Sequence, residues 1–200
     1  SAATLTADKA CYVHAASGVS MTITGSGWIP GTTVHLTAGA SLADATADAA
    51  GDVIFTSLAA PRLRTSGPGV KTTKLTATAT NPDGSQTTQM IRVRSANLSV
   101  ATKPGSVNNV RKDKVTFFFS GFTPGKHIYS YYLLGKKVVA KDKFGTATGP
   151  CGVLKQKALL YPGGRPNHDA STFTITLENT GRYDAGAFPR VTAQVQLFRF

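Results

Sequence analysis

MTITGSGWIPG, residues 21–31, decides the fold of this chain because it occurs twice. The second copy, VTFFFSGFTPG, spans residues 115–125 and lies 94 positions later. In each copy apolar side chains alternate along a strand, which is followed by Ser-Gly-aromatic and then by a Pro-Gly turn. Proline presets φ and glycine supplies a positive φ, so the pair predicts a turn. The repeated turn residues are Gly27, Trp28, Pro30, Gly31, Gly121, Phe122, Pro124 and Gly125.

The rest of the chain follows the same pattern. Thr, Val, Ala, Gly and Ser dominate and glutamate occurs once, as Glu178, which favours strands and turns over helices. Alternation and turn residues predict seven strands in each half, and seven short strands with regular turns are typical of an immunoglobulin-like β-sandwich. The expected strands are 3–8, 19–25, 33–38, 42–47, 53–58, 71–80 and 87–94, then 98–103, 114–120, 127–134, 137–143, 153–160, 172–178 and 190–199.

We therefore expect an all-β protein of two tandem immunoglobulin-like β-sandwich domains. The first spans residues 1–96, and the second, more basic one spans 97–200. Their separator, Ser95-Ala96-Asn97, is too short for a flexible tether, which predicts restricted bending between the domains.

Both copies resemble the GSGF-x-PG Ig-like modules of secreted and wall-associated proteins of actinobacteria and related bacteria. Ala45 to Phe55 matches the hairpin that these modules place after the third strand, and Gly149-Pro150-Cys151-Gly152 matches a GPCG segment of a partner domain. The resemblance implies a secreted bacterial surface protein. It says little about function, because this architecture has many roles.

Each expected domain contains one cysteine, Cys11 in the first and Cys151 in the second, so neither can contain its own disulfide. Alternating strand directions place both thiols near the domain boundary, and an extracellular setting favours their pairing. An interdomain Cys11–Cys151 bridge is the expected arrangement. Two separate buried thiols and intermolecular links are the alternatives.

Positive charge is concentrated in the second half of the chain. Residues 1–97 have a net charge of +2 and residues 98–200 a net charge of +10. In the second domain Lys136, Lys137, Lys141 and Lys143 come close in sequence to Tyr129 and Tyr131, a combination that can bind anionic polymers or glycans. Edge lysines also guard strands against unwanted pairing, and a basic surface keeps a protein soluble.

No catalytic or cofactor pattern is present in the sequence. His14, His35, His127 and His168 have no partner spacing for a metal, and the aspartates fall mostly in turns. A calcium site using Asp44, Asp48 and Asp52 is an alternative without a recognisable binding loop. We expect no enzyme, no cofactor and no metal. No apolar stretch has the roughly 18–20 residues of a membrane span.

These observations predict a secreted or cell-surface structural protein, either a self-assembling filament or surface-layer subunit or an adhesive module. The start at Ser1 without an initiator methionine fits a signal peptide that has been removed, and equally a chain trimmed at that place. The partners expected are further copies of the chain and a cell-wall or other anionic polymer, not nucleic acid. The main alternative is a module that binds an acidic polymer or carbohydrate through the second domain. A third is a small-molecule carrier resembling the enediyne-binding apoproteins.

Overall fold

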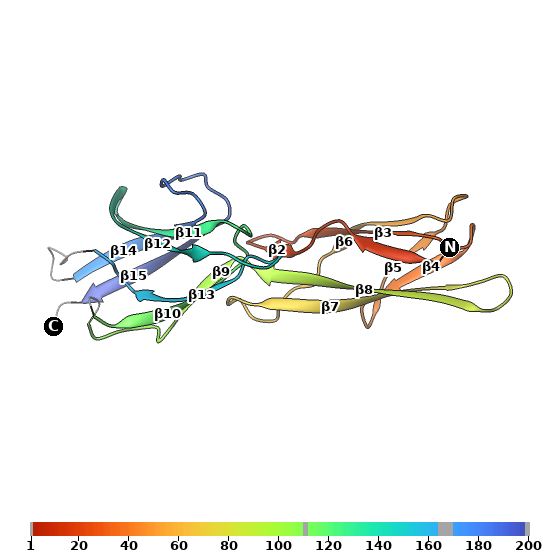
Figure 1. Cartoon of the computed structure of the whole chain (residues 1–200), viewed down its shortest axis with the longest axis horizontal. Coiled ribbons are helices and arrows are strands. Elements are labelled where there is room, and N and C mark those ends of the chain that lie inside the picture. The colour runs from red at the N-terminus through yellow and green to blue at the C-terminus, as the bar shows by residue number, and fades with distance from the viewer. Residues whose placement is uncertain (1, 110–111, 164–169, 199–200) are drawn as a thin grey trace. The chain divides into compact units, whose positions relative to one another are not determined.

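The computed structural model describes every residue except 1, 110–111, 164–169 and 199–200 (Figure 1). The described residues form fifteen strands and no helix. They divide into two compact units, of which unit 1 is Ser1–Arg64 with Val70–Ala96 and unit 2 is Thr65–Gly69 with Asn97–Phe200. Each unit is an immunoglobulin-like β-sandwich, which confirms the predicted fold class. His168 and position 199 of the last expected strand lie outside the described residues.

Unit 1 consists of a three-stranded and a five-stranded sheet. The first has the order β1 (Thr4–Ala7), β3 (Ser20–Ser26), β6 (Val53–Ala59). The second has the order β2 (Tyr12–His14), β8 (Gln86–Asn97), β7 (Val70–Thr80), β4 (Thr33–Thr37), β5 (Ser41–Thr46). The apolar positions of the repeated motif face inward because side chains alternate along a strand, so Met21 and Ile23 are fully buried.

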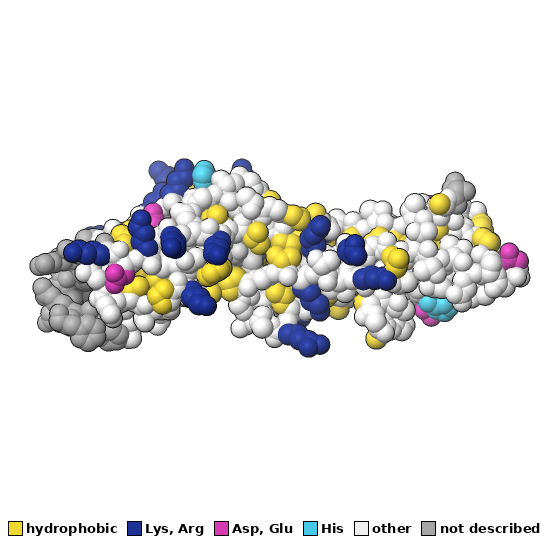
Figure 2. Space-filling view, turned by 60° about the horizontal axis from the view of Figure 1, so that its bottom comes forward, with side chains coloured by type: hydrophobic (Ala, Val, Ile, Leu, Met, Phe, Trp, Pro, Cys, Tyr) yellow, Lys and Arg dark blue, Asp and Glu magenta, His cyan; other side chains and the backbone are white. Residues whose placement is uncertain are grey.

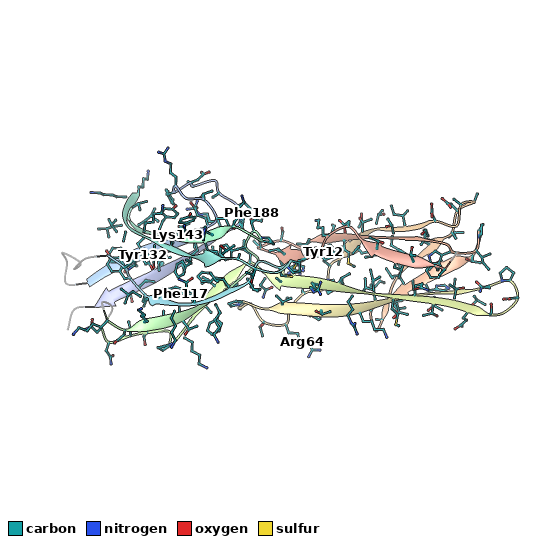
Figure 3. All side chains as sticks on the ribbon, viewed as in Figure 1. Tyr12, Arg64, Phe117, Tyr132, Lys143 and Phe188 are labelled. Atoms are coloured by element: carbon teal, nitrogen blue, oxygen red, sulfur yellow. The ribbon has the colours of Figure 1, made fainter. Side chains whose placement is uncertain are left out.

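Unit 2 repeats this plan, and its described residues form no counterpart of β2. Its sheets have the orders β9 (Ser99–Lys103), β10 (Lys114–Ser120), β13 (Leu154–Leu159) and β12 (Lys137–Thr146), β11 (His127–Leu134), β14 (Ala170–Glu178), β15 (Arg190–Phe198). Phe117 of β10 and Tyr132 of β11 are buried in the core between the two sheets (Figure 3). The Phe117 ring packs edge-on against Phe144 with centroids 4.9 Å apart, and the Tyr132 hydroxyl donates to Leu160 O at 2.8 Å.

Every strand expected from alternation has a counterpart in the structure, and the structure adds β2. This strand has only three residues, Tyr12–His14, which is too short to establish an alternation that could be recognised in the sequence. Unit 1 therefore has eight strands where seven were expected.

The repeated motif joins the turn after its strand to a later connection of the same unit. In unit 1, Gly31 N donates to Ala47 O at 2.9 Å, and in unit 2, Gly125 N donates to Ala147 O at 2.8 Å. Gly27, Gly31, Gly121 and Gly125 all have positive φ, and the prolines before the second glycine of each copy, Pro30 and Pro124, are exposed. The repeat in sequence is thus a repeat of hydrogen-bond geometry.

The aromatic residue of each motif packs over a glycine from that later connection. Trp28 N donates to Gly51 O at 3.1 Å, and Phe122 N donates to Gly152 O at 3.3 Å. Gly51 has φ 82° and an added Cβ would lie 2.4 Å from Trp28 O, whereas Gly152 has φ 55° and its Cβ would lie 1.6 Å from Phe122 O. Only glycine fits at either position, and this explains the last residue of the GPCG segment.

Thr65–Gly69, which the sequence analysis placed in the first domain, belongs to unit 2. Asn97 Nδ2 donates to Thr65 O at 2.6 Å and to Gly67 O at 2.9 Å. Gly69 N donates to Ser120 Oγ at 3.0 Å, and that hydroxyl donates to Asn97 O at 2.6 Å. The chain therefore passes between the units three times, after Arg64, after Gly69 and after Ala96.

Candidate functional site

Basic and aromatic side chains gather on the outer face of the β12–β11–β14–β15 sheet of unit 2. On β11, Ile128 and Tyr132 face the core and are fully buried, so Tyr129 and Tyr131 face outward. The strand register places Lys143 opposite Tyr129 and Lys141 opposite Tyr131. We call this surface, defined by Tyr129, Tyr131, Lys141 and Lys143, the basic–aromatic face; Lys143 is labelled in Figure 3.

Lys141 is the centre of the basic–aromatic face. Its Nζ atom lies 4.9 Å from the Tyr129 ring centroid and 5.4 Å from the Tyr131 ring centroid. Both distances are within the range of cation–π attraction. The same ammonium group donates to the Gly181 carbonyl. Lys141 is thus held in place by two rings and one backbone oxygen.

The loop 179–189 lies against this face and holds Tyr131. The Tyr131 hydroxyl donates to Thr180 O at 2.7 Å, and its ring meets Tyr183 edge-on with centroids 5.6 Å apart. Arg190 lies over the Tyr183 ring at 5.3 Å and donates to its hydroxyl at 2.9 Å. Arg190 also donates to Asp184 O at 3.2 Å. Side-chain contacts from β11 and β15 therefore fix the course of the loop.

Glu178 is fully buried beneath this loop. One carboxylate oxygen, Oε1, accepts from the Thr180 hydroxyl at 2.5 Å and from Asp184 N at 3.0 Å, while Oε2 has no hydrogen-bond partner among the described residues. Burial raises the pKa of Tyr131 to about 12, and the charges of Glu178 and Tyr129 act in the same direction. At neutral pH the Tyr131 hydroxyl keeps its proton and is a donor, which does not suit it to act as a general base.

The structure brings together four of the six residues predicted for a basic and aromatic site. Lys136 lies in the hairpin turn, and Lys137 begins β12 opposite Leu134, at the other end of that strand from Lys143. Three further residues, Glu178, Tyr183 and Arg190, contribute to the site and were not predicted from the sequence. Glu178 could have been noticed because it is the single glutamate of the chain. Tyr183 and Arg190 lie in or beside a loop that folds back over the sheet, and no local sequence pattern predicts that fold.

Lys and Arg side chains also lie elsewhere on unit 2. Figure 2 shows them over the face of that unit in view, with few acidic side chains among them. Lys155 lies over the Phe118 ring at 5.5 Å on the other sheet. Unit 2 thus has basic side chains on both sheets. In the basic–aromatic face a lysine contacts two tyrosine rings and a backbone carbonyl.

Cys11 and Cys151 are both disulfide-bonded, and no described cysteine is free. This contradicts the alternative of two separate buried thiols. The pairing of Cys11 with Cys151 within one chain stays a prediction. Peptide mapping of the unreduced protein by mass spectrometry, with reduced protein as the control, will identify the linked peptides.

The acidic and histidine side chains show ordinary structural roles. Asp48 Oδ1 accepts from Ala50 N at 2.8 Å and Asp52 N at 2.9 Å, as in a turn. His35 pairs with Asp44 on the surface at 2.8 Å. Among the described residues no group of three or more His, Cys, Asp or Glu side chains could hold a metal ion. No helix in the described part of the chain is long and apolar enough to cross a membrane.

Comparison with known proteins adds little to this geometry. No protein-family model matches the chain, and no curated protein matches it. Among solved structures, the chain is similar to one described as "Structures of Clostridium thermocellum CbhA fibronectin(III)-like modules", with 13% identity and a TM-score of 0.33, covering 98% of this chain and 93% of that one. A likeness at this level carries no argument about fold or function, and the fold assignment therefore rests on the sheet topology described above.

Proposed function

We propose that the protein is a non-catalytic structural or adhesive module of a bacterial cell surface, secreted and able to assemble with further copies. The observation that carries the proposal is the triple passage of the chain between its two units, with Thr65–Gly69 built into unit 2 by Asn97 and Ser120. Three covalent connections resist separation of the units better than one linker does. Such a connection suits a module that transmits force.

The state of the cysteines supports the extracellular part of the proposal. Disulfides persist mainly in oxidising compartments outside the cytosol, and both cysteines of this chain are disulfide-bonded. The basic–aromatic face supports the non-catalytic part. Its tyrosine hydroxyl stays protonated and its central lysine is engaged by two rings, which suits contact with a partner better than proton transfer.

Negative-stain electron microscopy of the natively secreted protein, with light scattering on the same sample, tests the proposal. Regular filaments or a closed oligomer are expected. A monomer at every concentration would contradict self-assembly. Fractionation of the producing cells tests the location, and recovery in the cytosolic fraction would contradict secretion.

A second function, binding of an acidic polymer, is favoured by the arrangement of Lys141 and Lys143 beside Tyr129. Heparin is a suitable polyanion probe, and its affinity should fall as salt rises. The double variant Lys141→Gln/Lys143→Gln should weaken binding more than Lys136→Gln/Lys137→Gln, which removes the same charge away from the face. Equal losses would indicate a general surface charge effect and contradict a site.

A further inference from the structure

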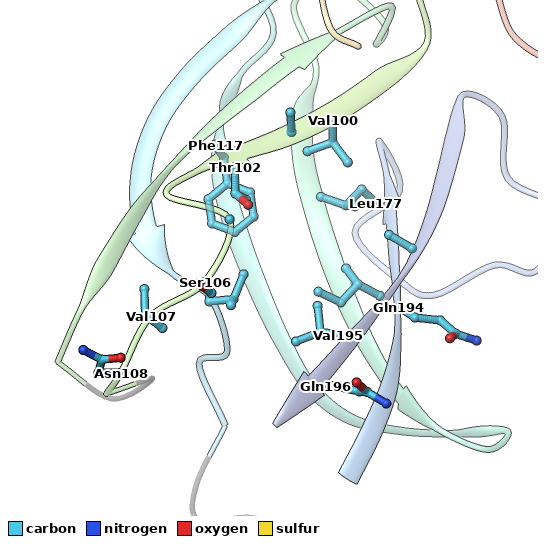
Figure 4. Close-up of a pocket in the computed structure, with 15 residues that line it drawn as sticks. Val100, Thr102, Ser106, Val107, Asn108, Phe117, Leu177, Gln194, Val195 and Gln196 are labelled. Carbon is cyan, nitrogen blue, oxygen red and sulfur yellow. The ribbon is translucent and has the colours of Figure 1, made fainter. Parts of the chain in front are cut away.

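Unit 2 contains a groove of about 520 Å³ between the edge strands β9 and β15. Figure 4 shows side chains of β9, β10 and β15, and of the connection after β9, around this space. Phe117 and Leu177 of the core are among its lining residues, and Val100, Val107 and Val195, which are only partly buried, also line it. The volume is within the roughly 300–1,000 Å³ of ligand-binding clefts.

In unit 1, β2 occupies the corresponding edge of the last strand. The strand β2 is hydrogen-bonded to the last strand, β8, and Tyr12 is fully buried in the core. The Tyr12 hydroxyl donates to Asp8 Oδ1 at 2.6 Å, and that oxygen also accepts from Thr22 N at 2.9 Å. A short strand with one large aromatic side chain thus completes the sandwich of unit 1.

The corresponding segment of unit 2 does not form this strand. The repeat offset of 94 positions places Ser106–Asn108 in the position of Tyr12–His14, and the pairing register of β1 and β9 shifts the match by one residue to Val107. Val107 is partly buried against the core and too small to replace a tyrosine. Within the described residues, no strand pairs with the free edge of β15. The groove therefore lies where unit 1 has Tyr12 and β2.

We infer that this groove accepts an extended peptide segment of a partner polypeptide, which adds to the free edge of β15 and places one tyrosine-sized side chain in the space that Tyr12 fills in unit 1. Main-chain hydrogen bonds to an edge strand supply affinity in such strand addition, and a pocket for a side chain supplies specificity. The inference deepens the proposed structural role and rests on it, because it names the surface by which the module contacts another chain.

The lining of the groove selects a neutral segment. Among the described residues that line it none is charged, although the second half of the chain has a net charge of +10. Thr102, Ser106 and Asn108 supply hydroxyl and amide groups at the groove, and these can donate to and accept from a peptide backbone. The described lining residues therefore offer a polyanion no positive charge. The groove and the basic–aromatic face thus suit different partners.

A peptide with the sequence of residues 8–16 and Cys11→Ser is the probe, because it contains the segment that fills the equivalent place in unit 1. Fluorescence anisotropy of the labelled peptide with the full-length chain should show saturable binding. The same peptide with Tyr12→Ser should bind at least about tenfold more weakly, as expected on removal of an interface hot spot. No binding of the first peptide, or equal binding of both, would overturn the inference.

Two variants of the chain locate the binding site. Val107→Tyr places an aromatic side chain in the groove from within the chain and should abolish peptide binding. Thr192→Tyr changes an exposed residue of β15 that does not line the groove, and should bind the peptide as the unchanged chain does. Peptide binding that survives Val107→Tyr would place the peptide elsewhere and overturn the inference.

The same experiment separates the inference from the proposed self-assembly. Peptide binding by a chain that light scattering shows to be monomeric supports the groove and contradicts assembly. Filaments from a chain that does not bind the peptide support assembly and overturn the groove. Filaments that Val107→Tyr abolishes would identify a second copy of the chain as the partner.

Discussion

Units 1 and 2 share one fold and one motif but differ at the edge of the last strand. In unit 1 that edge is paired with β2 and the fully buried Tyr12 fills the interior beside it. In unit 2 the edge of β15 is free among the described residues and a groove of about 520 Å³ remains. The segment with Tyr12 closes the edge of the sandwich in unit 1. The corresponding segment of unit 2 has Val107 in that place and leaves the edge open. Free edges attract other strands, so a repeat can acquire an interaction surface by losing one strand.

The largest expected effect comes from removing the side chain that closes unit 1. Tyr12→Ala should lower the free energy of unfolding of unit 1 by about 3–5 kcal/mol, because it leaves a cavity in the core. Tyr12→Phe keeps the ring and loses one hydrogen bond, at a cost of about 1 kcal/mol. Urea denaturation measures both. Similar small losses for the two variants would show that the ring does not close the unit.

Gly152 of the GPCG segment and Gly31 of the first motif give a second comparison between the units. Gly152→Ala should lower the free energy of unfolding by at least about 2 kcal/mol, because positive φ costs an alanine about 1–2 kcal/mol and its Cβ would also meet Phe122 O. Gly31→Ala is the matched control, because Gly31 also has positive φ but nothing lies within 4 Å of the added Cβ. Its free energy of unfolding should fall by only about 1 kcal/mol. Thermal unfolding of both variants measures the difference. Equal losses would exclude the contact with Phe122 as the cause.

Filling the groove should make unit 2 more like unit 1. Val107→Tyr should raise the free energy of unfolding of unit 2 by about 1 kcal/mol, the usual gain from filling a cavity. Thr192→Tyr, on the same unit but away from the groove lining, should leave it within about 0.5 kcal/mol of the unchanged chain. Urea denaturation compares the three proteins. A loss of stability in Val107→Tyr would mean that the groove does not match the place of Tyr12.

The last comparison concerns alkaline pH and Tyr131, on the outer face of the β12–β11–β14–β15 sheet of unit 2. Its pKa is raised to about 12 in the folded chain from the ordinary value of 10.0. The unfolded chain therefore loses this proton first, so the stability contributed by Tyr131 is complete below pH 10 and is lost as pH rises towards 12. Tyr131→Phe should lose less stability than the unchanged chain between pH 9 and pH 11.5, as measured by urea denaturation. An unchanged pH dependence would contradict the raised pKa.

Much of the fold could be predicted from the sequence because alternation and Pro-Gly turns are local signals. The positions of Met21 and Ile23 on the inner face of β3 follow directly from them. The strand β2 could not be predicted, since three residues show no period. The groove could not be predicted either, because it depends on how separate strands pack around Val107.

The candidate site was predicted in part for the same physical reason. Lys141 and Lys143 alternate with inward-facing residues on one strand, so their common face with Tyr129 and Tyr131 follows from strand geometry. Lys136 and Lys137 fall at the turn end of the hairpin, where closeness in sequence does not mean a common face. The burial of Glu178 depends on a loop that folds over it, which is a tertiary contact that no local pattern encodes.

The passage of the chain into unit 2 at Thr65–Gly69 has a consequence for the order of folding during synthesis. Gly69 N has its partner, the Ser120 hydroxyl, 51 positions later in the chain. At the usual rate of about 5–20 residues per second, roughly 3–10 s pass between the synthesis of the donor and that of its acceptor. The segment Thr65–Gly69 therefore stays without this anchor until β10 has been made, although the strands of unit 1 on either side of it in the chain, β6 and β7, are already synthesised.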